Sequence, residues 1–360
     1  MNNYKRIVVK VGSNVLTRAD GMPDTTRMSS LVDQIARLHA EGVQVILVSS
    51  GAVASGRGVM RSVGHLDSVS ARQLFSAVGQ VRLINRYYDL FGEWGIVCGQ
   101  VLTTKESLST RRHYLNQRNC METMLATGVI PIVNENDTIS VSELMFTDND
   151  ELSGLLCTMM GADALIILSN IDGIYDGSPA DPQSSVIRRV AVGQTLEQYI
   201  QTSRSTRGRG GMGTKSRISQ KVAGEGIEVI IANGTRDGIL TDLVLTDKDV
   251  VCTRFEPAAK SASGVKMWIA HSEGFAKGEL HLNEGATRAI TESLAASILP
   301  VGVVSVEGDF ERDDIVRIIS HDGRRIGVGR VTADSAKVRQ LLGVKGEKPL
   351  VHYDYMYLEL

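Results

Sequence analysis

Short apolar runs alternate with amphipathic segments through the first two thirds of the 360-residue chain, and this alternation restricts the fold more than any other feature. The runs are continuously apolar, as expected for strands that are buried on both faces of a parallel sheet. We expect strands at residues 6–11, 43–48, 95–101, 129–133, 164–168 and 229–232. Repeated βαβ units of this kind predict an α/β domain with a mostly parallel sheet.

Helical patterns fill the intervals between these runs. Residues 26–41 place apolar side chains on one face, and Gly42 provides a stop signal. Further helices are expected at 70–94, 111–127, 152–160 and 214–224. Crossover helices cover both faces of a parallel sheet, so we predict that the sheet is sandwiched by helices.

The character of the chain changes after Pro257. Residues 258–263 are small and polar, which is typical of a linker. Beyond them, turn signals separate short strand-like runs at 278–282, 303–306 and 315–319, with one helical pattern at 286–294. This part of the sequence predicts a small β-rich barrel. We therefore divide the chain into an α/β domain (1–257), a linker region (258–273) and a C-terminal domain (274–360).

Composition and charge exclude several classes of protein. The formal net charge of -2 creates no field that would gather nucleic acid. No apolar run approaches the roughly 20 residues that cross a bilayer, and the first strand begins too close to Met1 for a secretory leader. The four cysteines form no CxxC pair, which argues against zinc and disulfides and fits a reducing compartment. We expect a soluble cytoplasmic protein.

The histidines of the C-terminal part give no sign of a metal site or of a catalytic site. His281, His321 and His352 are scattered and accompany no cysteine. We predict that all three are structural, and we name no residue as a metal ligand.

Two polar clusters flank the run at 129–133 and the helix that follows it. They consist of Asn134, Glu135, Asn136 and Asp137, and of Asp148, Asn149, Asp150 and Glu151. Ligands of open α/β sheets bind at the carboxyl ends of strands, where both clusters fall. One interpretation is a pair of polar loops with an Asx cap on the helix. The other is a site for a small polar substrate beside a phosphate or a metal.

Two earlier segments each allow a structural interpretation and an anion-binding interpretation. Lys10 interrupts the first strand near its carboxyl end, either as an edge lysine with its head in solvent or as a phosphate ligand. Residues 49–56 are small and follow the second strand. They allow backbone N–H groups to approach an anion, or they allow tight packing of the strand on the next helix.

A glycine- and arginine-rich loop at 203–213 leads into the helix at 214–224. The loop approaches a Walker A motif, but Thr214 precedes Lys215, in the reverse of the required order. Flexible backbone donors, a helix N-terminus and a lysine still favour phosphate. The alternative is a mobile basic surface loop.

Six segments in a fixed order resemble the glutamate 5-kinase branch of the amino acid kinase family. They read VVKVGSNVL, VSSGAVASG, IPIVNENDTIS, FTDNDELS, LSNIDGIY and GRGGMGTK. GELHLNEGATRAI is similar to the opening of the PUA domain that ends these enzymes. Two departures are Ser169-Asn170, where a Thr-Asp pair is common, and a short PUA end.

The resemblance implies direct in-line transfer of the γ-phosphoryl group of ATP to the side-chain carboxylate of L-glutamate. The product is L-glutamyl 5-phosphate, and the reaction opens proline biosynthesis with proline as an inhibitor. The resemblance further implies Mg²⁺ with ATP, a homotetramer, and glutamyl phosphate reductase as a possible partner. A carboxylate acceptor is already ionised at neutral pH, so the chemistry needs no general base.

The family's functional residues carry over to matching positions. Lys10 and Lys215 are implied to steady the transferring phosphoryl group, with Asp150 organising the two lysines. Ser50, Asp137 and Asn149 are implied to bind glutamate. The ATP contacts are implied to be Lys10, Ser169, Asn170, Arg209, Gly210, Gly211, Met212, Gly213, Thr214 and Lys215. Whether Asp148 or Asp150 positions lysines or helps to hold Mg²⁺ stays open.

Three other interpretations remain at this point. The chain could be acetylglutamate kinase or a more distant family member, such as aspartokinase or uridylate kinase. PUA-like domains also occur on RNA-modifying enzymes, but the segment from residue 274 has no dense basic stripe with aromatics. The C-terminal domain could instead serve only assembly or regulation.

Overall fold

The computed structural model describes residues 4–60, 64, 66–108, 111–140, 146, 148–199, 211–259, 269, 275–293 and 296–358. The chain divides into two compact units, one comprising 1–108 and 112–261 and the other comprising 109–111 and 262–360. Most of the expected linker region (258–273) lies outside the described residues. Each unit is described by itself.

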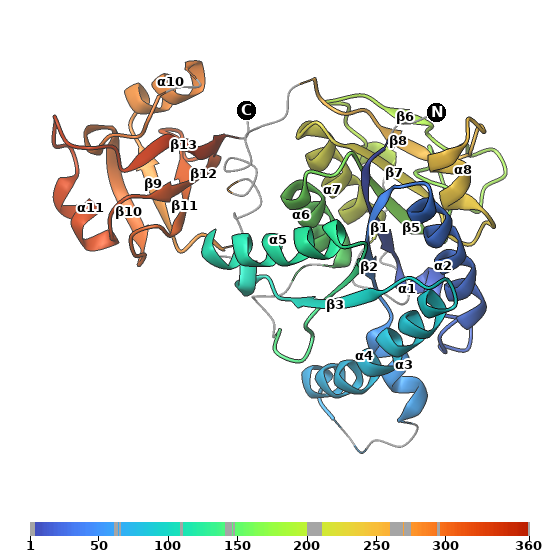
Figure 1. Cartoon of the computed structure of the whole chain (residues 1–360). Helices are drawn as coiled ribbons and strands as arrows, with labels where there is room; N and C mark the ends of the chain where they lie inside the picture. The colour runs from blue at the N-terminus through green and yellow to red at the C-terminus, as the bar shows by residue number, and fades with distance from the viewer. Residues whose placement is uncertain are drawn as a thin grey trace. The chain divides into compact units, whose positions relative to one another are not determined.

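Eight described strands of the first unit form one sheet in the order β3-β4-β2-β1-β5-β7-β8-β6 (Figure 1). The strands are β1 (Arg6–Val11), β2 (Gln44–Ser49), β3 (Cys98–Thr103), β4 (Ile130–Glu135), β5 (Ala164–Ser169), β6 (Arg189–Val190), β7 (Glu228–Asn233) and β8 (Thr253–Phe255). Every described pair is parallel except β7–β8. The expectation of a mostly parallel sheet is confirmed.

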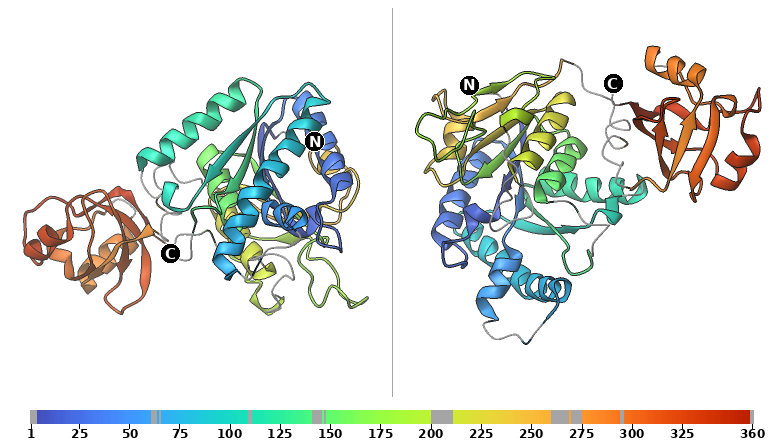
Figure 2. Two further views of the ribbon diagram at one scale, coloured as in Figure 1. Left: turned by 90° about the horizontal axis from the view of Figure 1, so that it is seen from below. Right: turned by 180° about the vertical axis from the view of Figure 1, so that it is seen from behind.

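Helices cover both faces of this sheet (Figure 2). They are α1 (Ser13–Leu16), α2 (Thr25–Ala40), α3 (Ala52–Val59), α4 (Ser68–Gly92), α5 (Arg111–Ala126), α6 (Asn149–Met160), α7 (Met212–Gly224) and α8 (Ile239–Leu245), with 3-10 turns η1 (Glu106–Leu108) and η3 (Glu197–Tyr199). Helix α2 contacts α4 and α8 on one face, while α6 and α7 contact each other on the other. No described helix is both long and apolar enough to traverse a membrane.

The first unit differs from the sequence prediction in several details, and strands β6 and β8 and helices α1 and α8 were not predicted. The strand expected at 95–101 begins only at Cys98, because Gly95 has a φ of 66° and forms the turn after α4. The small residues that follow β2 are not only a loop, since Ala52 begins a helix. Small side chains leave few periodic apolar positions, so the pattern did not reveal this helix.

The described strands of the second unit form a five-stranded sheet in the order β10-β9-β11-β12-β13. Its elements are β9 (Gly278–Leu282), α10 (Glu284–Glu292), η5 (Pro300–Gly302), β10 (Val303–Gly308), β11 (Ile315–Ile319), β12 (Arg325–Val331), α11 (Ser335–Leu341) and β13 (Val351–Leu358). It has its own apolar core, built on Leu280, Val316 and Ile318. The β-rich character is confirmed, while β12, β13 and α11 were not predicted.

Helices α3 and α4 approach each other backbone to backbone. A Cβ on Gly79 of α4 would lie 1.8 Å from the carbonyl oxygen of Ala52, and a Cβ on Gly56 of α3 would lie 1.9 Å from that of Phe75. Real Cβ atoms do not approach backbone so closely, so only glycine fits at both positions. This crossing fixes the helix that follows β2 against the long helix α4.

We predict that Gly79→Ala destabilises the protein by about 3 kcal/mol or more, because the added methyl group forces two backbones apart. Gly92→Ala is the matched control, since Gly92 ends the same helix and an added Cβ would meet no described atom within 4 Å. That control should be neutral or stabilising by up to about 1 kcal/mol. Urea unfolding of both variants makes the comparison, and equal effects would contradict the close-packing argument.

Candidate active site

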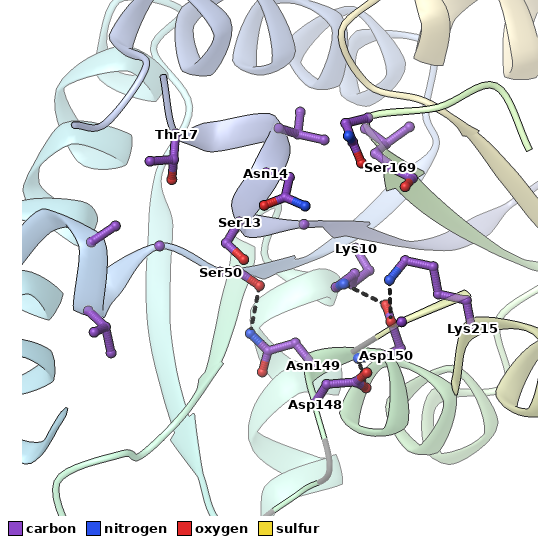
Figure 3. A pocket seen from close by; sticks show the side chains of 18 of the residues that line it. Lys10, Ser13, Asn14, Thr17, Ser50, Asp148, Asn149, Asp150, Ser169 and Lys215 are labelled. Carbon is purple, nitrogen blue, oxygen red and sulfur yellow. Dashed lines mark hydrogen bonds and ion pairs between the residues drawn. The ribbon is translucent and has the colours of Figure 1, made fainter. Parts of the chain in front are cut away.

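A cleft of about 1300 Å³ opens at the carboxyl ends of β1, β2, β4 and β5. Its lining comes from segments far apart in the sequence, among them Lys10, Ser50, Asn149, Ser169 and Lys215 (Figure 3). The strand order brings these lining residues together, because β4, β2, β1 and β5 are consecutive neighbours and end at the same edge of the sheet. This edge is the usual ligand site of open α/β sheets.

Two lysines converge on one buried carboxylate in this cleft (Figure 3). Lys10 Nζ lies 2.5 Å from Asp150 Oδ1, and Lys215 Nζ lies 2.9 Å from Asp150 Oδ2. The Asp150 side chain is fully buried, and those of Lys10 and Lys215 are 6% and 11% exposed. The edge-lysine interpretation of Lys10 is therefore wrong, since β1 lies between β2 and β5. The three groups carry a net charge of +1 at the cleft wall.

Asp148 caps the helix that carries Asp150. Its Oδ1 accepts hydrogen bonds from the backbone N–H groups of Asp150 (2.9 Å) and Glu151 (3.1 Å). Its Oδ2 has no hydrogen-bond partner within the part of the chain that the structure describes. The Asx cap that one interpretation expected is present, and it holds the first turn of α6, which carries Asp150.

The pKa values of Asp148 and Asp150 are shifted in opposite directions. Burial, together with the nearby charge of Asp150, raises the pKa of Asp148 to about 6 despite the two lysines. Burial also acts to raise the pKa of Asp150, but the two lysine ammonium groups outweigh it and hold that pKa below its usual value. Asp150 is therefore the permanent anion that keeps Lys10 and Lys215 in place.

A chain of side-chain amides lines the side of the cleft near β2 and β4. Asn149 Nδ2 donates to Ser50 Oγ (3.0 Å) and to Asn134 Oδ1 (3.1 Å). Asn134 Nδ2 in turn donates to Gln80 Oε1 of α4 (2.9 Å). The structure brings together Ser50 and Asn149, which lie 99 residues apart in the sequence.

The third residue expected on this side, Asp137, is held from α4. Its Oδ1 lies 3.6 Å from Arg72 Nε, and Ser76 Oγ donates to its Oδ2 (3.4 Å). Sequence reasoning missed Arg72, Ser76 and Gln80. They share one helix face at a spacing of four residues. A solvent-exposed helix face has polar residues at the same spacing. The sequence therefore could not distinguish residues that line a site from residues that face solvent.

The opposite side of the cleft carries the residues expected to contact a nucleotide. Ser169, Asn170, Gly211 and Met212 line it, and Gly211 is the N-cap of α7. Gly213 and Thr214 lie in the first turn of α7 without lining the described cleft. The expected contacts Arg209 and Gly210 lie outside the described residues, as do residues 203–208 of the same loop. The backbone N–H groups at the start of α7 suit an anion.

Comparisons with known proteins agree with this architecture. The amino acid kinase family model matches residues 5–233, and the PUA domain model matches residues 278–352. The chain is 65% identical to glutamate 5-kinase of Bacteroides thetaiotaomicron, with 99% of each chain covered. It is 48% identical to glutamate 5-kinase of Chlorobaculum tepidum, covering 99% of this chain and 98% of the relative.

A solved structure supports the fold of the first unit. Carbamate kinase from Giardia lamblia bound to AMP-PNP superposes with a TM-score of 0.52 at 16% identity, covering 72% of this chain and 100% of that one. At this identity the likeness concerns the fold alone. The family models and the full-length relatives show that the chain belongs to the amino acid kinase family, in the glutamate 5-kinase branch that carries a C-terminal PUA domain.

Proposed function

We propose that the protein transfers the γ-phosphoryl group of ATP to the side-chain carboxylate of L-glutamate and forms L-glutamyl 5-phosphate, the first step of proline biosynthesis. The observation that carries this proposal is the pair of buried lysines on Asp150, in a cleft of a chain 65% identical to a glutamate 5-kinase. A cleft of about 1300 Å³ exceeds the usual range for one small ligand, which suits two substrates.

The reaction requires the protein to provide positive charge rather than a general base. Glutamate and the γ-phosphate are both anions, so their approach must be offset and charge on the phosphoryl oxygens stabilised. Lys10 and Lys215 can supply this charge from two sides. Asp150 holds both ammonium groups by one carboxylate, so their separation is set before substrates bind.

Glutamate recognition is assigned to the side of the cleft near α4. The Ser50 hydroxyl can donate to a carboxylate of glutamate, and Asp137 offers an anion to its α-ammonium group. Asn149, whose two amide N–H groups bind Ser50 and Asn134, would contact glutamate by exchanging one of these hydrogen bonds. Arg72 and Ser76 hold Asp137 in position. N-acetylglutamate has no ammonium group, so this assignment favours a glutamate kinase over the alternative, acetylglutamate kinase.

ATP is assigned to Lys10, Ser169, Asn170 and the segment from Arg209 to Lys215. The acidic groups present also fit Mg²⁺, which binds through few carboxylates when substrate phosphates supply other oxygens. Both oxygens of Asp150 face lysines, whereas Asp148 Oδ2 is buried and has no hydrogen-bond partner among the described residues. Asp148 is therefore the carboxylate that would help to hold the ion, which would neutralise charge on the ATP phosphates.

The proposal also includes three further properties of the glutamate 5-kinase branch. They are inhibition by proline at a site that overlaps the glutamate site, assembly into a homotetramer, and possible docking of glutamyl phosphate reductase. Proline shares an ammonium group and an α-carboxylate with glutamate, which motivates the overlapping site.

The first test of the proposal is ADP release with glutamate, N-acetylglutamate, aspartate and UMP as acceptors. Glutamate should be preferred over N-acetylglutamate by about 10²-fold or more in kcat/KM, because the acetylated substrate lacks the ammonium group that pairs with Asp137 and brings added bulk to its place. Asp137→Ala should raise the glutamate KM steeply, change the ATP KM little and reduce the preference for the free amine.

The variant Asp137→Asn separates charge from shape, since it keeps the size of the side chain. It should lose glutamate affinity nearly as strongly as Asp137→Ala. Equal use of glutamate and N-acetylglutamate by the wild type would refute both the role of Asp137 and the proposed substrate.

A second prediction concerns the two lysines. Lys10→Met and Lys215→Met should each lower kcat by about 10²-fold or more, the scale of losing one charge-stabilising group, with smaller changes in glutamate KM. Lys248→Met serves as the control, because Lys248 pairs with Asp242 on the surface and its side chain is 66% exposed. Steady-state kinetics measure the effect, and an unchanged kcat in both cleft variants would remove the lysines from the mechanism.

A third prediction follows from the raised pKa of Asp148, about 6 against the ordinary value of 3.8. Between these values the unfolded chain releases the proton of Asp148 while the folded protein retains it, so this group lowers stability as pH rises through that window. Asp148→Asn cannot titrate, and Asn also caps helices well. The variant should therefore gain about 2–3 kcal/mol relative to wild type between about pH 4 and pH 7.5.

Urea unfolding without substrates at several pH values measures this difference. The contribution of Asp150 has the opposite sign, being lost as pH falls, but it is present in both proteins and largely cancels. A stability difference that does not change with pH would mean that Asp148 ionises normally in the folded protein.

A further inference from the structure

Three side chains with metal-binding groups meet on one face of the C-terminal sheet. Glu279 and His281 lie two residues apart on β9, so their side chains project from the same face. Glu307 of β10 is paired directly with Glu279 in the antiparallel register. Strand β9 lies between β10 and β11 in the sheet (Figure 1). The register alone brings these three side chains together.

The imidazole of His281 faces both carboxylates. Its Nε2 lies 3.6 Å from Glu279 Oε2 and 3.5 Å from Glu307 Oε1, and the three ligand atoms lie within 4.8 Å of one another. This nitrogen is buried from solvent and makes no hydrogen bond to any described residue. A buried ring nitrogen without a hydrogen bond is uncommon and calls for a partner.

The distances fit ligands around an ion better than they fit hydrogen bonds. N–H···O bonds are commonly about 2.9–3.0 Å long. Nitrogen and oxygen ligands that each lie about 2.0–2.2 Å from a tetrahedral Zn²⁺ are about 3.4 Å from one another. The two separations from His281 Nε2 are close to this second value.

The local charge also favours a cation. Carboxylates directly opposite each other on paired strands destabilise a sheet. Arg317 of β11 lies 3.5 Å from Glu279 Oε1 and balances one of the two charges, which leaves Glu279 Oε2 facing His281. With a neutral imidazole, the group of Glu279, Glu307, His281 and Arg317 carries a net charge of -1.

We propose that Glu279 Oε2, His281 Nε2 and Glu307 Oε1 form a binding site for a divalent transition metal ion of the Zn²⁺ type, with solvent as the remaining ligand. An imidazole ligand disfavours Mg²⁺ and Ca²⁺, which prefer oxygen, and suits Zn²⁺ and its neighbours. The ion ties β10, an outer strand of the sheet, to β9. This site is independent of the kinase cleft and of the proposed phosphoryl transfer.

Titration of the full-length protein with Co²⁺ tests the proposal, because tetrahedral Co²⁺ absorbs visible light strongly. The wild type should show this absorption at one equivalent, and Zn²⁺ should abolish it by displacement. His281→Gln and Glu307→Gln should each weaken Co²⁺ binding by about 10-fold or more, since each removes one of three protein ligands. The matched control His321→Gln changes an exposed histidine in the turn after β11 and should bind like wild type.

Melting temperatures distinguish metal binding at this site from metal binding elsewhere on the protein. Zn²⁺ should raise the melting temperature of the wild type and of His321→Gln, and should raise it less or not at all in the two ligand variants. The Glu307 side chain is 68% exposed, so Glu307→Gln should fold normally and keeps the test valid if His281→Gln does not. Unchanged Co²⁺ absorption and affinity in Glu307→Gln, or no absorption in the wild type, would overturn the proposal and leave an ion pair of imidazolium with two carboxylates.

Discussion

The buried contact of Lys10 and Lys215 with Asp150 is the interaction on which the site depends. One fully buried carboxylate faces two ammonium groups, and a buried charge that loses its partner costs about 3–5 kcal/mol. The arrangement requires β1 in the middle of the sheet, with α6 packed on β1 and α7 packed beside α6. Its surplus positive charge lies at the cleft wall, where an anionic phosphoryl group would be received.

The other half of the cleft depends on how closely two helices approach. Gly56 and Gly79 let α3 and α4 touch backbone to backbone. Helix α4 then directs Arg72 and Ser76 toward Asp137, and Gln80 toward Asn134 at the end of β4. The packing of α3 on α4 is therefore also a constraint on the residues that we propose to bind glutamate. The same helix carries Gly92, where no such constraint exists, which shows that the requirement is local.

In the C-terminal unit, strand pairing determines which charged side chains meet. Its sheet mixes parallel and antiparallel pairs, and β9 has a neighbour of each kind. That placement sets Glu279 beside Glu307 on one strand and beside Arg317 on the other. Charged residues on neighbouring strands thus become a compact group that neither strand contains alone.

The sequence by itself determined the alternation of strands and helices, the parallel sheet, and the position of the polar residues at strand ends. These properties follow from local periodicity and from residue order, which one chain segment displays on its own. The burial of Lys10, the polar stripe of α4 beside Asp137, and the carboxylates around His281 were decided only by the tertiary structure. Each depends on which strands pair and which helices cross, and those contacts join residues too far apart for periodicity to record. Lys10 illustrates the difference, since its position near a strand end was readable while the neighbours that bury it were not.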